Sequence, residues 1–344
     1  MASTPRAWKL ADGFGTEHLH LVEAPVAEPG PGQVRIRVRA VSLNFRDLML
    51  VRGLYDPRMP LPRVPLSDGA GEVEAVGPGV TRFKAGDRVC GLFAPGWYAG
   101  EAPADTLSRA LGHRSDGMAR DVVVADAADF VAVPPHLTFE QAATLPCAAV
   151  TAWHALMGGP EPLKPGQTVL VQGTGGVSLF ALQIARLAGA RVIVTSSDDS
   201  KLERALALGA EHGINYKRTP EWGRAAKVKS GGRGVDFVVE VGGAGTLNES
   251  LAAIRAGGHI AVIGVLSGKS VPLDVTSLLM RAVRLQGIFV GHREHFEALN
   301  RAVTAGGLAP VVDRVYDFDA LPEALTHLGL GAHFGKIVLR TDTP

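Results

Sequence analysis

The feature that most constrains this fold is an apolar strand that runs through a glycine turn into a helix. The strand covers 168–172, the helix follows over 179–185, and the turn between them contains Gly173, Gly175, Gly176 and Val177. Gly173 permits a tight turn, and Gly175 lets the backbone approach a bound group closely. The helix N-terminus offers unpaired N–H groups and the positive end of a dipole. The segment therefore predicts a loop that binds the pyrophosphate of a dinucleotide.

From about Thr138 onward, β-branched apolar runs alternate with longer amphipathic segments. The apolar runs are Thr168–Gln172, Arg191–Thr195, Val235–Val241, His259–Gly264 and Leu285–Val290. Strands that alternate with helices form βαβ units on a parallel sheet. Ser178 occupies the third small position of the glycine pattern, and serine is small enough for the close helix-to-strand packing required there. The middle of the chain is therefore predicted to be an α/β domain with a doubly wound parallel sheet.

The sequence on either side of this domain has a different pattern. Val34–Arg39 alternates apolar and basic side chains, as in a half-buried antiparallel strand. The irregular stretch over 92–116 is longer than most loops. Val311–Tyr316 and Gly335–Leu339 are again strand-like, so the C-terminal segment is predicted to return to the first domain. The 344 residues are predicted to form a β-rich domain over 1–137 and 293–344 and a dinucleotide-binding domain over 138–292.

The end of the second predicted strand indicates which dinucleotide is bound. NAD enzymes place an acidic side chain there, on the 2′-hydroxyl of the ribose. Here Ser196 stands at that position and Lys201 follows, so a 2′-phosphate would meet a hydroxyl and a cation. Asp198 and Asp199 would repel a phosphate, but their positions suit the N-cap and first turn of a helix. The pattern favours NADPH over NADH.

Charge and composition exclude several classes of partner. The 35 basic and 34 acidic side chains nearly balance, so the chain has no general attraction to nucleic acid or to an anionic membrane. The first residues lack the apolar core of a signal peptide, and no later stretch is apolar for long enough to cross a bilayer. Cys90 and Cys147 alone cannot form a disulfide framework. We expect a cytoplasmic protein that binds a small molecule.

Several ordered motifs accompany the glycine loop along nearly the whole chain. They are Asn44-Phe45-Arg46-Asp47, Arg52-Gly53-Leu54-Tyr55, Gly69-Ala70-Gly71-Glu72-Val73, Gly86-Asp87-Arg88-Val89 and Ala142-Ala143-Thr144-Leu145-Pro146. In these motifs the chain resembles the medium-chain dehydrogenase/reductase superfamily, and specifically its zinc-free quinone oxidoreductase branch. The resemblance implies a GroES-like catalytic domain, an inserted Rossmann domain and a homodimer formed through the Rossmann domains.

The same resemblance implies further cofactor contacts. It places Tyr216 and Lys201 at the 2′-phosphate, which again favours NADPH, and Thr151 beside the nicotinamide. Open α/β sheets bind ligands at the carboxyl ends of their strands. The additional candidates for cofactor binding, three of which follow predicted strands, are Gly242, Gly264, Val265 and Lys336.

Zinc is not expected in this chain. Zinc alcohol dehydrogenases of the superfamily hold the catalytic metal at positions that correspond here to Asn44, Ser67 and Cys147. A neutral amide and a serine hydroxyl are poor zinc ligands. The stretch over 92–116 contains no cysteine, so a structural zinc site is not expected either. The histidine pairs without a matching third ligand are His18 with His20 and His292 with His295.

The absence of zinc restricts the chemistry. Hydride transfer to a simple ketone builds negative charge on the carbonyl oxygen, which zinc would stabilise as a Lewis acid. Quinones and α,β-unsaturated carbonyls delocalise that charge themselves, so hydrogen-bond donors suffice to stabilise it. The candidate donors are the Asn44 amide and the Tyr55 hydroxyl, and Tyr55 is also a candidate proton relay. The structural alternatives are a loop role for Asn44 and a packing role for Tyr55.

Other polar and aromatic residues near these motifs have structural explanations. Asp47 is expected to hold Arg88 or a neighbouring backbone group rather than to take part in chemistry. Phe93, Trp97 and Tyr98 either cover an aromatic substrate or fix the long loop that contains them.

Three other functions remain open at this point. A zinc-type alcohol dehydrogenase would depend on metal, and a non-catalytic NADPH-binding protein would bind the cofactor without turnover. An enoyl-thioester reductase would need a basic entrance for a phosphorylated carrier arm. The arginines that suggest such an entrance, or simply a solvated surface, are Arg46, Arg52, Arg58 and Arg63.

Overall fold

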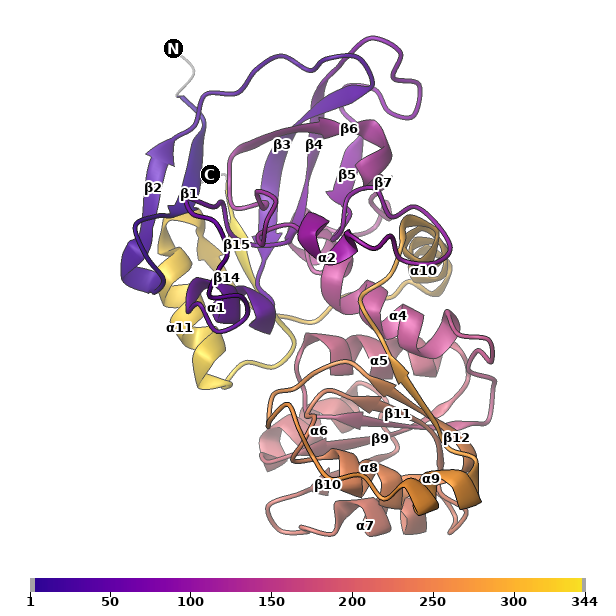
Figure 1. Cartoon of the computed structure of the whole chain (residues 1–344). Helices are drawn as coiled ribbons and strands as arrows, with labels where there is room; N and C mark the ends of the chain where they lie inside the picture. Colours follow the sequence, from indigo (N-terminus) through magenta and orange to yellow (C-terminus); the bar gives the residue numbers. More distant parts are fainter. Residues whose placement is uncertain (1–3, 342–344) are drawn as a thin grey trace. The chain divides into compact units, whose positions relative to one another are not determined.

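The computed structural model describes residues 4–341 and divides them into two compact units. The first three residues, which belong to the N-terminal segment that lacks the apolar core of a signal peptide, lie outside this range. The first unit comprises residues 4–150 and 292–341, and the second comprises residues 151–291 (Figure 1).

The first boundary lies at 150/151, not at 137/138, and the second lies at 291/292. Helix α3 (Phe139–Ala142) and the π-helical turn η3 (Leu145–Ala149) pack on β4 (Asp68–Val76). Helix α3 also packs on β3 (Gln33–Ser42). The segment after Thr138 is therefore helical, but the sheet of the first unit covers it. A helical pattern does not reveal which of two sheets the helix will cover.

The first unit is built on a seven-stranded sheet with the order β14-β15-β3-β4-β5-β7, and β6 pairs with β3. Its further strands are β5 (Arg88–Gly91), β6 (Val122–Asp126), β7 (Phe130–Ala132), β14 (Val312–Asp317) and β15 (Lys336–Arg340). All pairings are antiparallel except that of β14 with β15. A separate antiparallel pair joins β1 (Arg6–Leu10) to β2 (Leu19–Glu23).

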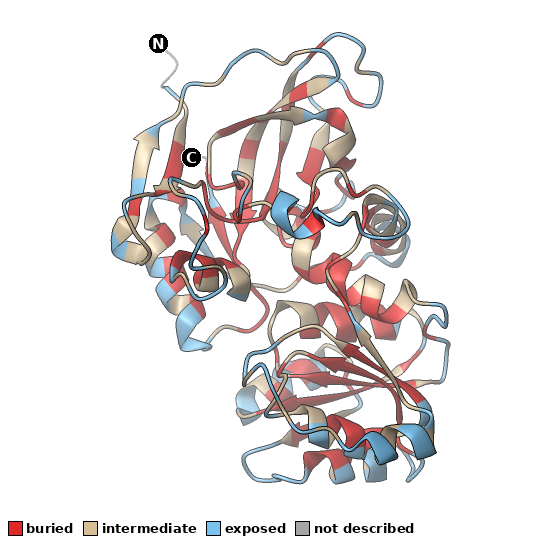
Figure 2. Cartoon of the chain, in the orientation of Figure 1, coloured by how far each residue is buried: buried red, intermediate tan, exposed pale blue. Residues whose placement is uncertain are grey.

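Strand β3 has the alternation that the sequence predicted. Val34, Ile36 and Val38 are buried in the core, whereas the arginines between them are partly exposed (Figure 2). Arg35 and Arg37 both pair with Glu74. One face of the strand therefore faces the core and the other remains polar, which confirms the prediction of a half-buried antiparallel strand.

The C-terminal segment returns to the first unit, as predicted, because β15 pairs with β3. The helices of this unit are α1 (Phe45–Val51), α2 (Thr106–Arg109), α3, α10 (Arg293–Gly306) and α11 (Leu321–Leu330). Single helical turns occur at η1 (Thr16–His18), η2 (Ala127–Asp129) and η4 (Phe318–Ala320). Helix α11 packs against α1 and β15 and buries Leu321, Leu325 and Leu328.

The second unit is a six-stranded parallel sheet with the order β10-β9-β8-β11-β12-β13. The strands are β8 (Thr168–Gln172), β9 (Arg191–Ser196), β10 (His212–Asn215), β11 (Val235–Glu240), β12 (Ile254–Val262) and β13 (Arg284–Gly287). The helices are α4 (Val150–Met157), α5 (Gly176–Leu187), α6 (Asp199–Ala207), α7 (Trp222–Lys229), α8 (Leu247–Ala253) and α9 (Val275–Arg281). In Figure 1, α5 lies on one side of this sheet and α7 and α8 on the other. No helix within residues 4–341 is both long and apolar enough to cross a membrane.

The five predicted strands of this domain correspond to β8, β9, β11, β12 and β13. The sequence did not predict β10, because its residues, His212–Asn215, contain no apolar run. This strand lies at the edge of the sheet and pairs only with β9. The last predicted strand extended to Val290, whereas β13 ends at Gly287.

Candidate functional site

The glycine turn joins β8 to the twelve-residue helix α5. Gly173 has a φ of +71°, a left-handed conformation that favours glycine, and its N–H donates to the Thr195 carbonyl oxygen at 2.7 Å. A Cβ atom added at Gly173 or Gly175 would meet no other atom within 4 Å. The space beside the loop is therefore open, at the positive end of a helix. This geometry fits the predicted pyrophosphate, which Gly173, Gly175, Gly176 and Val177 would surround.

Ser178 shows how the altered third position of the glycine pattern is accommodated. Its side chain is buried, and its hydroxyl donates to the Gln172 carbonyl oxygen at 2.6 Å. The bond joins the first turn of α5 to the end of β8. Serine therefore permits the expected close packing and adds a contact that Gly or Ala would lack.

A buried carboxylate at the end of β11 holds the adjacent loop of the same sheet edge. Glu240 Oε1 accepts hydrogen bonds from the N–H groups of Gly242 and Gly243, both at 2.9 Å. The Thr246 hydroxyl donates to the same oxygen at 2.5 Å. Glu240 has no exposed surface. Its carboxylate therefore fixes the backbone that follows β11.

The same carboxylate also reaches β8, the neighbouring strand. Glu240 Oε2 accepts from Gln172 Nε2 at 2.7 Å and from the Ser250 hydroxyl at 2.5 Å. Gln172 Oε1 in turn accepts from the N–H groups of Val241 and Gly242, each at 3.2 Å. Gln172 directly precedes the glycine turn, so one network joins the two loops. The sequence analysis missed both residues, although each is a polar residue at the end of an apolar strand.

The candidate residues after β11 and β12 lie beside this network. The N–H of Gly264 donates to the Glu240 carbonyl oxygen at 3.2 Å. A Cβ atom at Gly264 would lie 2.2 Å from the Val241 carbonyl oxygen, and one at Gly242 would lie 2.3 Å from a threonine hydroxyl. Both positions therefore require glycine for packing within the protein itself. Val265 is 54% exposed and is the accessible member of this group. Thr151, in contrast, is buried in α4.

The end of β9 brings two of the predicted 2′-phosphate contacts together. Ser196, the last residue of the strand, is buried, and its carbonyl oxygen accepts from the Tyr216 N–H at 3.1 Å. The Ser196 hydroxyl accepts from the Asp198 N–H at 3.2 Å. Tyr216 follows β10 and is 41% exposed. The pairing of β9 with β10 therefore aligns two residues that are twenty positions apart.

The acidic residues after β9 cap a helix, as predicted. Asp198 Oδ1 accepts from the N–H groups of Ser200 and Lys201 at 2.8 and 3.2 Å. Hydrogen bonds from the Ser200 hydroxyl and from these backbone groups lower the pKa of Asp198. Asp199 lies 2.6 Å from the guanidinium of Arg218. Arg218 was missed by the sequence analysis, because the unpredicted strand β10 is what brings it to this edge.

The first unit contains a buried polar cluster centred on Asp68, the first residue of β4. Asp68 Oδ1 accepts from the Ser67 hydroxyl at 2.8 Å. Its Oδ2 accepts from the Ser42 hydroxyl and from the Cys147 N–H, each at 3.3 Å. The Lys336 ammonium lies 3.7 Å from the same oxygen. The cluster therefore joins four segments that are far apart in the sequence.

Lys336 connects this cluster to Asn44. The ammonium donates to the Leu43 carbonyl oxygen and to Asn44 Oδ1, both at 2.6 Å, and the lysine is only 3% exposed. Asn44 Nδ2 donates to the Ser67 hydroxyl oxygen at 3.4 Å. The structure therefore brings together two predicted site residues from opposite ends of the chain.

Asn44 also begins helix α1, where Asp47 holds its backbone. The Asn44 N–H donates to Asp47 Oδ2 at 2.8 Å, and the Arg46 guanidinium lies 3.2 Å from Asp47 Oδ1. Burial raises the pKa of Asp47 to about 6, and the charge of Arg46 opposes this shift. The expected bond to a neighbouring backbone group is confirmed. The alternative partner, Arg88, is wrong, because Arg88 donates to the Leu137 carbonyl oxygen instead.

Tyr55 lies beside two nitrogen-containing side chains. The Arg46 guanidinium lies 5.6 Å from the centre of its ring, and the His113 ring meets it edge-on at 5.8 Å. The tyrosine is 40% exposed, and its hydroxyl has no hydrogen-bond partner within the described residues. His113 Nε2 lies 3.0 Å from Asp56 Oδ2. Hydrogen bonds from His113 and Arg114 lower the pKa of Asp56 to about 2, so the residue after Tyr55 is held in place through its carboxylate.

Comparison with known proteins identifies the family. Residues 30–135 match the family model of the alcohol dehydrogenase GroES-like domain, and residues 176–305 match that of the zinc-binding dehydrogenases. A zinc-type alcohol dehydrogenase-like protein of Schizosaccharomyces pombe is 46% identical over 91% of this chain and 92% of its own length. The chain belongs to the medium-chain dehydrogenase/reductase superfamily.

Two solved structures are similar to this medium-chain dehydrogenase/reductase over nearly its whole length. An NAD-dependent alcohol dehydrogenase is 36% identical with a TM-score of 0.88, covering 98% of this chain and 100% of its own. A crotonyl-CoA carboxylase/reductase is 27% identical with a TM-score of 0.88, covering 99% of this chain and 89% of its own. The predicted fold, a GroES-like domain with a Rossmann domain, is thereby confirmed. The chain is an alcohol dehydrogenase-like oxidoreductase.

The description of one family model raises the question of zinc, and the side chains at the corresponding positions do not fit it. Asn44 Oδ1 faces the Lys336 ammonium at 2.6 Å, and the Ser67 hydroxyl donates to Asp68. A zinc ion beside Asn44 would therefore meet a second cation, and Cys147 would be the one soft ligand. No group of three or more His, Cys, Asp or Glu side chains within residues 4–341 is placed to hold a metal ion.

The aromatic residues of the long loop fix that loop. Phe93 and Trp97 are buried, and Trp97 Nε1 donates to a carbonyl oxygen three residues later. The Tyr98 hydroxyl donates to Asp129 Oδ1 at 3.1 Å, and the Arg46 guanidinium lies 4.7 Å from the Phe93 ring. Of the two expectations for these residues, these contacts correspond to the structural one.

The four arginines considered as a basic entrance are not equivalent. Arg46 pairs with Asp47, and Arg63 lies 2.9 Å from Asp116. Arg52 and Arg58 are exposed. A single entrance lined by all four guanidinium groups is therefore not what the structure shows.

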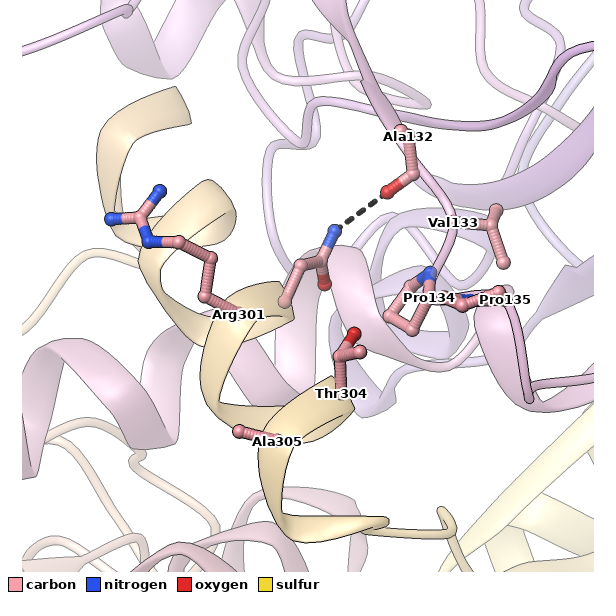
Figure 3. A pocket seen from close by; sticks show the side chains of 8 residues that line it. Ala132, Val133, Pro134, Pro135, Arg301, Thr304 and Ala305 are labelled. Carbon is pink, nitrogen blue, oxygen red and sulfur yellow. Dashed lines mark hydrogen bonds between the residues drawn. The ribbon is translucent and has the colours of Figure 1, made fainter.

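A depression of about 410 Å³ lies between α10 and the segment after β7 (Figure 3). It is lined by Ala132, Val133, Pro134, Pro135, Asn300, Arg301, Thr304 and Ala305. Asn300 Nδ2 donates to the Ala132 carbonyl oxygen at 2.8 Å across it. The lining includes none of the candidate site residues and one charged side chain, so we assign it no part in the chemistry.

Proposed function

We propose that this chain is a zinc-independent, NADPH-dependent oxidoreductase that transfers a hydride to a quinone or an α,β-unsaturated carbonyl. The observation that carries the proposal is the polar cluster around Asp68. An ammonium group occupies the cationic position beside Asn44, and the donors present do not suit a metal. Without a Lewis acid, the acceptor must delocalise the charge that hydride transfer places on its oxygen.

Bound NADPH would supply the hydride, and the second unit offers a place for each part of it. The open glycine turn would hold the pyrophosphate. Ser196, Lys201, Tyr216 and Arg218 lie at the edge where the 2′-phosphate would lie, and β9 ends in Ser196 rather than in an acidic residue. Thr151, Gly242, Gly264 and Val265 are the candidates for the nicotinamide end. One similar solved structure is that of an NAD-dependent alcohol dehydrogenase, so NADH is the cofactor to compare with NADPH.

The donors for the acceptor would come from the first unit. Asn44 offers an amide N–H, and Tyr55 offers an exposed hydroxyl that can also pass a proton. The name of the crotonyl-CoA carboxylase/reductase states that this relative reduces a conjugated thioester. An enoyl thioester is therefore the second candidate substrate, and Arg52 and Arg58 are the exposed cations that its carrier arm would meet.

The proposed partner, besides the small substrate, is a second copy of the chain. Strand β13 is an edge of the parallel sheet, and such an edge has unpaired backbone groups. Helix α9 precedes it and exposes three large apolar side chains, Val275, Leu279 and Met280. Exposed apolar groups beside a free sheet edge favour association through this unit.

The decisive experiment follows NADPH oxidation by the purified, chelator-treated protein. The acceptors are a quinone, an enone, an enoyl thioester and a simple ketone, each also tested with NADH. We expect turnover of the conjugated acceptors alone, faster with NADPH, and unchanged by the chelator. Activity that is lost to the chelator, or that is confined to simple ketones, would contradict the proposal. Tight NADPH binding without any turnover would favour a non-catalytic binding protein.

A further inference from the structure

Lys336 places a cation inside the first unit, where burial of a charge is costly unless it is compensated. It lies at the start of β15 and is 3% exposed. The ammonium donates to Leu43 O and Asn44 Oδ1 at 2.6 Å and lies 3.7 Å from Asp68 Oδ2. An ammonium has three N–H donors and no acceptor. Two of them therefore donate to oxygen atoms of the protein, and the Asp68 carboxylate lies within ion-pair distance of the ammonium.

These contacts determine which way the Asn44 amide faces. Its oxygen accepts from the ammonium, and its nitrogen donates to the Ser67 hydroxyl oxygen. The Ser67 hydroxyl hydrogen is already used, because it donates to Asp68 at 2.8 Å. Turning the amide over would place its NH₂ group against the ammonium and its oxygen against a hydroxyl lone pair. The amide therefore has one favourable orientation.

In that orientation Asn44 is available as a donor. Nδ2 carries two hydrogens. Ser67 accepts one of them, and the other has no protein partner among residues 4–341. The Asn44 backbone is also held, because its N–H donates to Asp47. Asn44 is therefore held through both its main chain and its side chain, and one N–H of Nδ2 remains available to donate.

We propose that Lys336 is a positioning residue, held by Asp68, that fixes the Asn44 amide so that its nitrogen donates to the oxygen of the acceptor. This inference rests on the proposed function and makes it more specific. It selects acceptors whose oxygen becomes negatively charged when the hydride arrives, since an N–H donor stabilises that state more than the neutral carbonyl. It also differs from the expectation that Lys336 contacts the cofactor directly.

The two roles of Lys336 predict different kinetics. A lysine that binds the phosphates of the cofactor controls its dissociation constant. A lysine that orients Asn44 controls kcat for the acceptor and leaves NADPH binding unchanged. The comparison uses Lys336→Met, which removes the charge, and Lys336→Arg, which keeps it. Lys84→Met is the matched control, because Lys84 is exposed and pairs with Asp87 at the surface.

We expect Lys336→Met to lower kcat for 1,4-benzoquinone and 3-buten-2-one by about a hundredfold, with an unchanged Kd for NADPH by fluorescence titration. Lys336→Arg should restore part of the loss, and Lys84→Met should behave like the wild type. An increase in the Kd for NADPH with unchanged kcat would overturn the inference in favour of a cofactor contact. Wild-type protein that reduces neither acceptor would overturn the proposed function itself.

A second measurement does not depend on turnover. The side-chain amide of Asn44 can be identified in a nitrogen-15 NMR spectrum as the pair of signals that Asn44→Ser removes. We expect its hydrogens to exchange with water faster in Lys336→Met than in the wild type and to regain slow exchange in Lys336→Arg. Equal exchange rates in all three folded proteins would overturn the positioning role. Thermal melts confirm that each variant is folded before either measurement.

Discussion

Each unit of this protein contains a polar network around a buried carboxylate, Glu240 in the second unit and Asp68 in the first, and the two networks differ in what neutralises the charge. Glu240, in the second unit, accepts from five neutral donors, of which two are backbone N–H groups of the adjacent loop. Asp68, in the first unit, also lies 3.7 Å from an ammonium. The Glu240 network fixes main chain beside the expected cofactor, whereas the Asp68 network fixes the side chain of Asn44. Buried acids of similar chemistry therefore serve different purposes.

The largest expected effect comes from Asp68, because its loss leaves a buried cation. Asp68→Asn should lower the free energy of unfolding by about 3 to 5 kcal/mol, measured by urea unfolding at pH 7. The double variant Asp68→Asn with Lys336→Met should lose less, since no charge then remains unpaired. An equally large loss in the double variant would show that Asp68 does not compensate Lys336.

A second effect of similar size concerns Asp47, whose pKa is raised by burial to about 6. The unfolded carboxyl ionises near pH 4, so between the two values the folded state retains a proton that the unfolded state has released. The free energy of unfolding should therefore fall as the pH rises from about 4 to 6, by up to about 3 kcal/mol. Asp47→Asn should remove this part of the pH dependence. If urea titrations gave the same pH dependence of the unfolding free energy for the wild type and for Asp47→Asn, the assignment would be contradicted.

A substitution in the Glu240 network should lower the free energy of unfolding less, because the donors to this carboxylate are neutral. Glu240→Gln replaces one accepting oxygen with an NH₂ group, which turns one hydrogen bond into a contact between donors. We expect a loss of about 2 kcal/mol in unfolding free energy and a higher Kd for NADPH. The kcat for the acceptor should stay unchanged, in contrast to Lys336→Met. An unchanged Kd for NADPH would show that the loop does not depend on Glu240.

The smallest effect is expected at an exposed carboxylate of the same unit. Glu211 pairs with Arg191 at 2.6 Å, and both side chains are 40% exposed. Glu211→Gln should change the unfolding free energy by less than about 1 kcal/mol, because solvent screens such pairs. It is the matched control for Glu240→Gln. A loss as large as that of Glu240→Gln would remove the distinction between buried and exposed carboxylates.

An element could be predicted from the sequence when the residues that define it are adjacent in the chain. The glycine turn and helix α5 were recognisable because the strand, the turn and the helix are adjacent in the sequence. Strand β10 was missed because its residues, His212–Asn215, carry no apolar period, and Arg218 was missed with it. The segment after Thr138 was recognised as helical but assigned to the other domain. The residue types of a short helix do not specify which sheet covers it.

The candidate site shows the same division. Asn44 and Tyr55 were named from their motifs and Lys336 as an additional cofactor candidate, but nothing in the sequence indicated that Lys336 would bond to Asn44, 292 positions away. Gln172 and Glu240 were missed, although each ends a strand that is mostly apolar. Several of their partners are backbone groups, which have no residue-type signal. A network of this kind becomes visible only when adjacent strands are aligned.

By itself, the sequence determined the α/β class, the dinucleotide loop, the return of the C-terminal strand and the poor set of zinc ligands. Each of these could be read from residue types along the chain, without any contact between distant side chains. Only the tertiary structure decided that Asp68 pairs with Lys336, that the ammonium faces Asn44, and that Glu240 joins two loops. These contacts link residues far apart in the chain. Their free energy depends on burial and on distances of a few ångströms, which only the packed sheets establish.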